Sequence, residues 1–370
     1  MKAIMTLSPF IGNLIGQALP DGWVIDRQLP RPGTAGATDL SGSFFSVGFI
    51  AKKTVGKKQT EAFLKVIDVG NALQAQPGHS SLMERLKNVT DSYSFECSVL
   101  DICEKARLDR VVQVIAKGEL PPPPGSAFPI PIPYMLFELA DGDVRKIVSR
   151  TNKIDDAWRL RVLHNVAVGL QQLHGVTIAH QDLKPSNVLL FETSGQGAKI
   201  GDLGRASRLG MEAQHDALAI AGALSYAPPE QAFGIRPELW VDRREGCDLY
   251  HLGTLATFLF AGITPTDFYL ENLPIDVRPA VWNGQSNCDY QTALPVLMST
   301  FTAFVDAVSS EIPEWARGEM SQIILNACNP DYKKRGDPGA RAQIGEPIGI
   351  QTFVARFARL SKRAEIEVRR

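Results

Sequence analysis

The sequence predicts an α+β chain with two lobes, because its front part has the pattern of strands and its back part the pattern of helices. Near the start, apolar and polar residues alternate in WVIDRQL, SFFSVGFIA and EAFLKVI, which is typical of an antiparallel sheet. After Gly142, apolar residues recur at three- and four-residue steps, as they do in amphipathic helices. A chain of 370 residues is long enough for two packed lobes with a cleft between them.

One helix is expected beside the front sheet. From Ser94 the apolar residues of FECSVLDICEKARL recur at helical spacing, whereas the composition over residues 69–93 is polar. Two further strands, VVQVIAKGEL and YMLFEL, flank a proline-rich segment at 120–133, where prolines remove backbone donors and favour an extended connection. A stiff exposed loop is the simplest interpretation of this segment, and a docking site for another protein is the alternative.

The back part should be mainly helical. Helices are expected in DAWRLRVLHNVAVGLQQLHG, DLYHLGTLATFLFAG, ALPVLMSTFTAFVDAVS and GIQTFVARFARLSKR. In the last of these, Phe353, Phe357 and Leu360 should cover the larger lobe, and the basic end SKRAEIEVRR is either a solvated face or a partner-binding tail. The expected parts are an N-terminal extension at 1–19, a first lobe at 20–140, a second lobe at 141–345, and a C-terminal helix and tail at 346–370.

The composition indicates a soluble protein of a reducing compartment. The formal net charge is -1, so the overall field attracts neither nucleic acid nor an anionic membrane. The five cysteines are scattered, without the paired spacing of a zinc site or a redox pair. The start lacks the pattern of a signal peptide, and the longest apolar stretch, near 252–263, is too short to span a bilayer. We therefore expect a cytoplasmic location, with no nucleic-acid or membrane partner.

The most informative segment is HQDLKPSNVLL, at 180–190, which places a Lys two residues and an Asn five residues after an Asp. This order resembles the catalytic loop of the protein kinase superfamily, and the resemblance covers roughly residues 20–345. It implies the two-lobed protein kinase fold. It also implies that Asp182 accepts the proton of the substrate hydroxyl, that Lys184 lies against the transferring phosphoryl group, and that Asn187 holds one Mg²⁺.

The other parts of a kinase site follow in order. In KIGDLGRAS, Asp202 begins a DLG that is similar to the family's DFG element, which makes Asp202 the main magnesium ligand. In EAFLKVI, Lys65 takes the place of the strand lysine that grips the α- and β-phosphates. Glu96 is its expected helix partner, because Leu100 matches the buried leucine that follows this glutamate, and Glu104 is the alternative. The long gap from Lys65 to Glu96 indicates an insertion near 68–90.

The resemblance also implies where ATP binds. Phe137 falls at the gatekeeper position, and the backbone of Glu138 and Ala140 would contact the adenine edge. Leu189 would form the floor of the adenine site and Val47 its roof.

The glycine-rich loop departs from the family pattern. Gly42 and Phe44 align with it, but Leu40 and Phe45 stand where glycines are expected. Glycine lets backbone amides close on phosphates, so the contacts here should be looser. The TAG at 34–36 is an alternative source of that flexibility.

Three other departures concern the nucleotide and the activation segment. Phe63 replaces a small alanine and should crowd the roof of the adenine site. Gln181 replaces the arginine that makes many kinases depend on a phosphate in this segment, where this chain has only Ser207 and Ser225. Ala223 replaces a threonine that hydrogen-bonds the catalytic Asp and Lys, and Ser225 is the candidate to compensate. Activity without activation-loop phosphorylation is therefore expected.

Two structural elements of the family are recognisable downstream. SYAPPEQ resembles the APE element, with Glu230 expected to pair with Arg335. The helix that begins near Asp248 resembles the one whose buried aspartate braces the catalytic loop.

Together these segments predict an ATP- and Mg²⁺-dependent serine/threonine protein kinase. The choice of serine/threonine as the phosphorylated residues rests mainly on Lys184 within DLKPSN. A pseudokinase that acts as a binding module is the first alternative, supported by the glycine loop and Phe63. A small-molecule phosphotransferase of the aminoglycoside kinase type is the second, although such enzymes normally lack the APE-like segment and the helix headed by Asp248.

Overall fold

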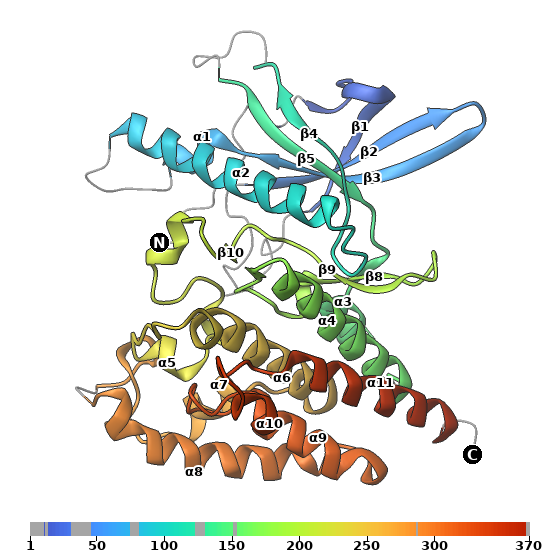
Figure 1. Ribbon diagram of the computed structural model, residues 1–370. Helices are drawn as coiled ribbons and strands as arrows, with labels where there is room; N and C mark the ends of the chain where they lie inside the picture. Colours follow the sequence, from blue (N-terminus) through green and yellow to red (C-terminus); the bar gives the residue numbers. More distant parts are fainter. Residues whose placement is uncertain are drawn as a thin grey trace. The chain divides into compact units, whose positions relative to one another are not determined.

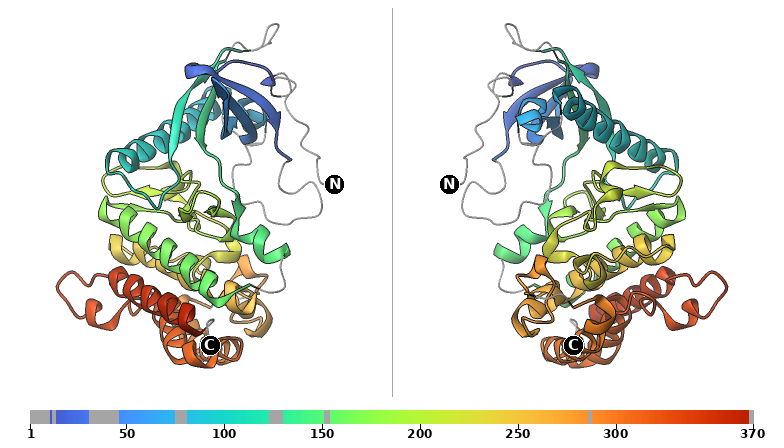
Figure 2. Two further views of the ribbon diagram at one scale, coloured as in Figure 1. Left: turned by 90° about the vertical axis from the view of Figure 1, so that its right-hand side faces the viewer. Right: turned by 90° about the vertical axis from the view of Figure 1, so that its left-hand side faces the viewer.

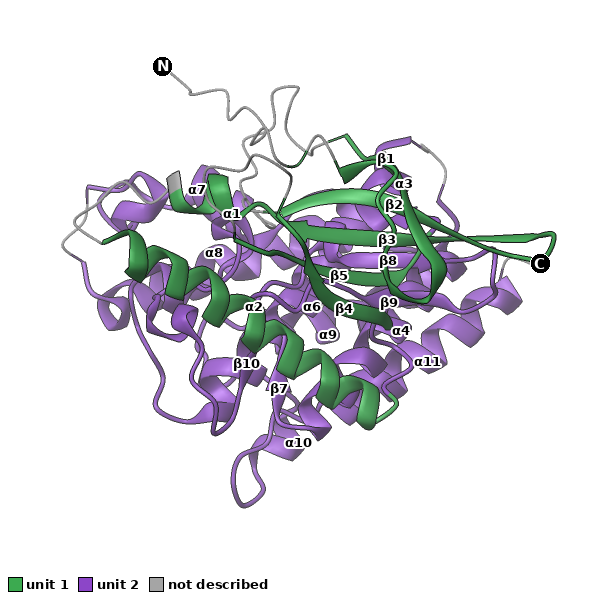
Figure 3. Cartoon of the chain, turned by 90° about the horizontal axis from the view of Figure 1, so that it is seen from above, with its two compact units in different colours: residues 1–107, 112–140 green, residues 108–111, 141–370 purple. Residues whose placement is uncertain are grey.

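The chain folds into two compact units in the computed structural model (Figure 3), which confirms the predicted α+β, two-lobed class. The first unit is Met1–Arg107 with Val112–Ala140, and the second is Leu108–Val111 with Asp141–Arg370. The structure describes residues 11, 14–30, 46–74, 81–122, 130–150, 154–285 and 288–367.

The first unit is built on a five-stranded sheet in which every neighbouring pair is antiparallel (Figure 1). Its buried face is apolar, with Phe49, Leu64 and Leu136 fully enclosed, so the alternation seen in the sequence matches the pleat. In order across the sheet, the strands are β1 (Trp23–Gln28), β2 (Ser46–Val55), β3 (Lys58–Ile67), β5 (Ile132–Glu138) and β4 (Val114–Leu120).

The helix beside this sheet, α2 (Leu82–Lys105), begins earlier than the sequence pattern predicted. The expected start at Ser94 was wrong, because polar residues continue the helix along its exposed side. Ser81 and Glu84 form a capping box that satisfies the first backbone amides, and this signal marks the true start. A short helix, α1 (Val69–Gln74), precedes it, so part of the segment taken for an insertion is helical.

The second unit is mainly helical, with two small sheets near its start (Figures 1 and 2). Its strands are β6 (Gly142–Asp143), β8 (Val188–Phe191) and β9 (Gly197–Ile200) in one sheet, and β7 (Ile178–Ala179) with β10 (Ser207–Arg208) in the other. Its helices are α3 (Val144–Arg150), α4 (Asp156–Gly175), α5 (Pro229–Ala232), α6 (Gly246–Ala261), α7 (Pro265–Asn272), α8 (Tyr290–Ser309), α9 (Glu314–Ala327), α10 (Pro338–Arg341) and α11 (Ile350–Glu367).

Helix α6 forms the centre of this unit and is buried along almost its whole length. A π-helical turn, η6 (Val241–Glu245), leads into it. Helix α11 runs along α4 (Figure 2), and it buries Phe353, Phe357 and Leu360. The amphipathic pattern of α11 therefore covers one side of the second unit.

Helix α8 is long and apolar enough, by length and composition, to cross a membrane, with a mean hydropathy of 1.4 in its most apolar window. One face of this helix packs within the second unit. Leu297 and Phe301 are buried, and the helix lies against α7 and α9. The window is 33% buried, so one face of α8 packs in the second unit and the other face is accessible.

Candidate active site

The carboxylate of Asp182 lies at the centre of a buried hydrogen-bond cluster in the second unit. Its Oδ2 accepts from Lys184 Nζ at 2.9 Å, and its Oδ1 accepts from the backbone N–H of Ala223 at 2.9 Å. Only 4% of Asp182 is exposed. The predicted departure at Ala223 is therefore compensated by its backbone amide, which replaces the missing threonine hydroxyl, rather than by Ser225.

Asn187 lies beside the same carboxylate and keeps its side-chain oxygen as an acceptor. Its Nδ2 donates to the Asp182 carbonyl at 2.8 Å, while its Oδ1 accepts only a longer contact of 3.3 Å from Ser186. The backbone N–H of Gly201 donates to the Asn187 carbonyl at 2.8 Å, which brings the neighbouring Asp202 to the same place. The structure thus places the Asp182 and Asn187 side chains together, with the backbone next to Asp202 bonded to Asn187.

This donor set suits Mg²⁺ held partly by phosphates. Among the described residues, no three His, Cys, Asp or Glu side chains gather to hold a metal ion by themselves. Mg²⁺ typically takes one or two protein oxygens and completes its shell with substrate phosphates and water. One carboxylate from Asp202 and one amide oxygen from Asn187 match that requirement.

Two residues of this cluster have backbone conformations that non-glycine residues seldom adopt. Gln181 has φ 64° and Asp202 has φ 59°, both in the left-handed region. Such conformations cost free energy, persist where the surrounding contacts fix them, and gather at functional sites. No sequence signal revealed them.

Asp248, in the first turn of α6, holds the catalytic loop from below the cluster. Its two oxygens accept the backbone N–H groups of His180 at 2.7 Å and Gln181 at 2.8 Å. Burial alone would raise the pKa of Asp248, but His174 Nε2 at 3.0 Å and the loop amides hold that pKa below its usual value. The bracing role predicted for Asp248 is confirmed, and His174 is a partner that sequence reasoning missed.

A second buried network connects the catalytic loop to the activation segment. Gln181 Nε2 donates to the Arg244 carbonyl at 2.9 Å, and Arg244 Nη1 donates back to Gln181 Oε1 at 3.1 Å. Arg244 also forms an ion pair with Asp216, whose Oδ1 accepts the Ser207 hydroxyl at 2.6 Å. Asp216 and Arg244 were not predicted, because no spacing rule singles out either residue.

The predicted Glu230–Arg335 ion pair is confirmed. Both guanidinium nitrogens donate to the carboxylate at 2.7 Å, and Arg335 is fully buried. Burial alone would lower the pKa of Arg335, but Glu230 raises it, so the pair stays charged. This pair fixes α5 against the segment that follows α9.

In the first unit, Lys65 Nζ donates to Glu96 Oε1 at 2.7 Å. Lys65 comes from β3 and Glu96 from α2, and both side chains are more than nine-tenths buried. Glu104, the alternative partner, is exposed, while Leu100 is buried as expected. The structure thus selects Glu96.

Phe63 shares a face of β3 with Lys65, because alternate residues of a strand point the same way. Its ring lies 6.4 Å from the ring of Phe137, the expected gatekeeper, on the neighbouring strand. Gly48 in β2 makes room for it, since a Cβ there would lie 2.9 Å from the Phe63 ring. Val47 was wrongly expected to form the roof: it lies opposite Val66 in the sheet and therefore points to the face away from Lys65, into the apolar core.

The remaining adenine-site residues are only partly placed. Glu138 and Ala140 are half-buried, and the backbone N–H of Glu138 donates to the Gln113 carbonyl at 3.1 Å. Leu189, the expected floor, is half-buried in β8 of the second unit. The glycine-loop residues lie outside the described residues; they are Leu40, Gly42, Phe44, Phe45 and the TAG at 34–36.

Comparisons with known proteins identify the family of the chain. The family model for the protein kinase domain matches residues 131–335, so the chain belongs to the protein kinase family. The chain is 25% identical, over 82% of its length, to the serine/threonine-protein kinase/endoribonuclease IRE1b of Arabidopsis thaliana, covering 33% of that protein. It is 31% identical, over 62% of its length, to a probable serine/threonine-protein kinase of Streptomyces coelicolor, covering 31% of it. The chain thus spans about a third of these relatives.

Proposed function

We propose that this chain is a serine/threonine protein kinase that transfers the γ-phosphate of ATP to protein hydroxyls, with Mg²⁺ as cofactor. The observation that carries the proposal is the buried carboxylate of Asp182, held by Lys184 and by the amide of Ala223, with Asn187 beside it. Phosphoryl transfer needs positioning and charge stabilisation more than covalent help. A carboxylate fixed from two sides supplies the positioning.

The residues divide the work as follows. Asp182 accepts the substrate's hydroxyl proton and aims its oxygen at the phosphoryl group, and Lys184 stabilises the charge that develops there. Asn187 and Asp202 would hold Mg²⁺, which would neutralise phosphate charge. Lys65, positioned by Glu96, binds the α- and β-phosphates.

The direct test measures transfer of radiolabel from ATP to a generic protein substrate. Asp182→Asn should lower the rate by about 10²- to 10⁴-fold, since it removes the general base. Lys65→Met should abolish most of the activity as well. Matched controls are Asp306→Asn, on the exposed side of α8, and Lys58→Met, on the exposed part of β3, and both should stay active. A pseudokinase would give no transfer in the wild type.

We also propose that activity does not require phosphorylation of the activation segment. Asp216 is a fixed carboxylate that anchors this segment to Arg244, and Arg244 holds the Gln181 side chain next to Asp182. Ser207 is buried and already donates its hydroxyl to Asp216, so a phosphate there has no room. The Asp216 carboxylate thus supplies permanently the negative charge that a phosphate supplies in kinases activated by phosphorylation of this segment.

Phosphatase treatment tests this second proposal. Protein freed of phosphate should keep its full initial rate, and Asp216→Asn should lower the rate by about tenfold, because a charged hydrogen bond of roughly 1.5 kcal/mol is lost. Ser225→Ala is the matched control and should remain active. A dephosphorylated wild type that is inactive, and that recovers after autophosphorylation, contradicts the proposal.

Transfer to protein rather than to a small molecule is supported by the APE-like segment, which the structure anchors through Glu230 and Arg335. Turnover of a peptide, with none of an aminoglycoside, separates the two classes. We place the enzyme in the cytoplasm, in line with its scattered free cysteines.

A further inference from the structure

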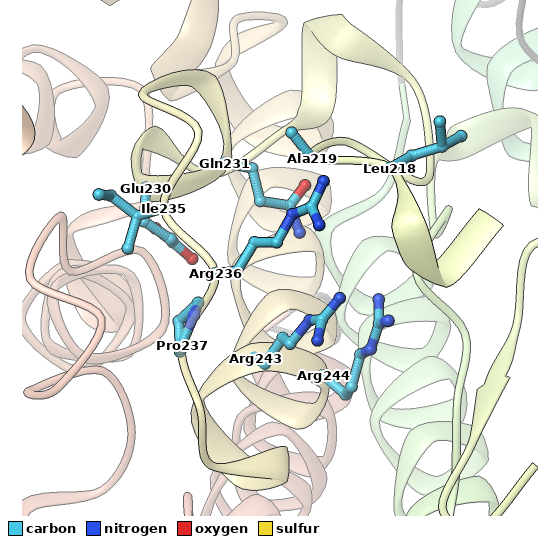
Figure 4. Close-up of a pocket in the computed structure, with 9 residues that line it drawn as sticks. All are labelled: Leu218, Ala219, Glu230, Gln231, Ile235, Arg236, Pro237, Arg243 and Arg244. Atoms are coloured by element: carbon cyan, nitrogen blue, oxygen red, sulfur yellow. The ribbon is translucent and has the colours of Figure 1, made fainter. Parts of the chain in front are cut away.

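We propose that a basic hollow in the second unit binds an acidic or phosphorylated side chain of the protein substrate, near the hydroxyl that is phosphorylated. The hollow lies beside α5 and is lined by Leu218 and Ala219 of the activation segment and by Arg236, Arg243 and Arg244 (Figure 4). The guanidinium groups of the three arginines point toward the segment that carries Leu218 and Ala219. The inference rests on the proposed protein kinase activity and adds substrate selection to it.

The positive charge of this hollow is only partly balanced. Arg244 is paired with Asp216, and Glu230, the acidic residue in the lining, is taken by Arg335. The other two arginines of the lining are Arg236 and Arg243. Among the described residues, no carboxylate lies within ion-pair distance of either one. Two guanidinium charges are therefore available to an incoming anion.

Both arginines are held in place by neutral contacts. Arg236 donates to the carbonyl of Ala217, and Arg243 donates to the carbonyl of Asp216 at 2.6 Å. A guanidinium has five N–H donors, so one bond to a carbonyl fixes the group and leaves further donors for a ligand. Planar guanidinium groups match carboxylate and phosphate oxygens in pairs. Arg236 is exposed and Arg243 is half-buried, so a side chain can reach them.

The hollow lies close enough to the catalytic carboxylate to act on the same peptide. Ala223, whose N–H donates to Asp182 at 2.9 Å, follows the hollow residue Ala219 by four residues, which span at most roughly 14 Å. An extended peptide advances about 3.3 Å per residue. The anionic side chain should therefore stand within about four residues of the phosphorylated Ser or Thr.

The test compares peptides that differ at one position near a single serine. Asp, phosphoserine, Ala and Lys are placed in turn at each of the four positions on both sides, and kcat/KM is measured for each peptide. We expect one position where Asp or phosphoserine is preferred over Ala by about tenfold, the change that one charged contact supplies. The Asp and phosphoserine arms tell an acidic substrate from one that is already phosphorylated.

Charge reversal assigns the preference to the hollow. Arg236→Glu should reduce the ratio of the acidic to the neutral peptide to about one or below, and should favour Lys at the same position. Lys362→Glu, an equal charge change on the exposed side of α11, should leave the ratio as in the wild type. A ratio near one in the wild type, or one that Arg236→Glu does not change, overturns the proposal.

Peptide binding separates this proposal from the catalytic one. Peptides with Ala in place of the acceptor serine cannot be phosphorylated, and fluorescence anisotropy measures their affinity directly. If the acidic peptide binds about tenfold more tightly than the neutral one and Arg236→Glu removes this difference, the proposed binding role of the hollow is supported, even when no phosphoryl transfer is found. If transfer occurs but neither binding nor kcat/KM depends on peptide charge, the proposal for the hollow is overturned and the kinase assignment is kept.

Discussion

The two units differ in how firmly they hold their parts of the site. In the second unit, Asp182 and the loop around it are fixed by buried bonds from Lys184, Ala223 and Asp248. In the first unit the described part of the site rests on one ion pair, Lys65 with Glu96, beside the large ring of Phe63. The groups proposed to transfer the phosphoryl group are thus constrained from several sides, whereas the sheet proposed to bind the nucleotide departs from the family pattern.

The match to the family model follows the same division. It begins at residue 131, within the last part of the first unit, and ends at Arg335, so Lys65 and Glu96 lie outside it. We infer that the second unit preserves the chemistry, while the first unit adapts how the nucleotide is held. Three changes test this comparison, and the one with the largest expected effect comes first.

The largest effect on stability should come from the anchor of α5 in the second unit. Glu230→Gln leaves the fully buried Arg335 without its carboxylate, which should lower the free energy of unfolding by about 3 to 5 kcal/mol. Urea denaturation measures this. The exposed pair Arg359–Glu319 is the control, and Glu319→Gln should cost less than about 1 kcal/mol. An equal loss of unfolding free energy in Glu230→Gln and Glu319→Gln would show that burial does not strengthen the Glu230–Arg335 ion pair.

Acid should weaken the second unit through His251. Burial lowers the pKa of His251 from 6.5 to about 4, so the folded chain keeps this residue neutral while the unfolded chain protonates it. The unfolded state then binds more protons, and stability falls as the pH drops from 6.5 toward 4. Between pH 7 and 5 we expect a loss of about 2 kcal/mol.

Urea denaturation at both pH values checks this, with His251→Leu as the comparison. The variant should lose less stability on acidification than the wild type does. The described part of the first unit contains no histidine, so an equal pH effect in the two proteins would place the acid sensitivity elsewhere.

The smallest effect should come from Phe63 in the first unit. Its ring lies on the same face as Lys65, so removing it in Phe63→Ala opens space for the adenine. The KM for ATP should fall by about threefold to tenfold, up to 1.4 kcal/mol of binding. The KM for ATP of Phe63→Leu should lie between those of the wild type and Phe63→Ala. A rise in KM would mean that the ring supports the nucleotide rather than crowding it.

The sequence predicted the fold class from short patterns, and the resemblance to the kinase family predicted the ion pairs Lys65–Glu96 and Glu230–Arg335. Alternation gave the strands, and the ordered spacing of Asp182, Lys184 and Asn187 gave the catalytic loop. Glu96 was chosen correctly because Leu100 matches the buried leucine that follows this glutamate in the family. The start of α2 was missed, because exposed polar residues hide helical periodicity and only the capping box at Ser81 marks the boundary.

The networks that hold the site were not readable from the sequence. Asp216 pairs with Arg244, which is 28 positions away, and Ala223 acts through its backbone N–H, which every residue type except proline has. His174 meets Asp248 only because α4 and α6 pack together. Tertiary packing creates these contacts, and no spacing rule encodes them.

The central proposal is that the chain binds ATP with Mg²⁺, and that this binding needs the side chains of both Lys65 and Asp202. Calorimetric titration of ATP, with and without Mg²⁺, into the wild type, Lys65→Met and Asp202→Asn tests it most directly. We predict Mg²⁺-dependent binding to the wild type that both substitutions weaken. Absence of binding to the wild type, or binding that neither Mg²⁺ nor either substitution changes, would contradict the account.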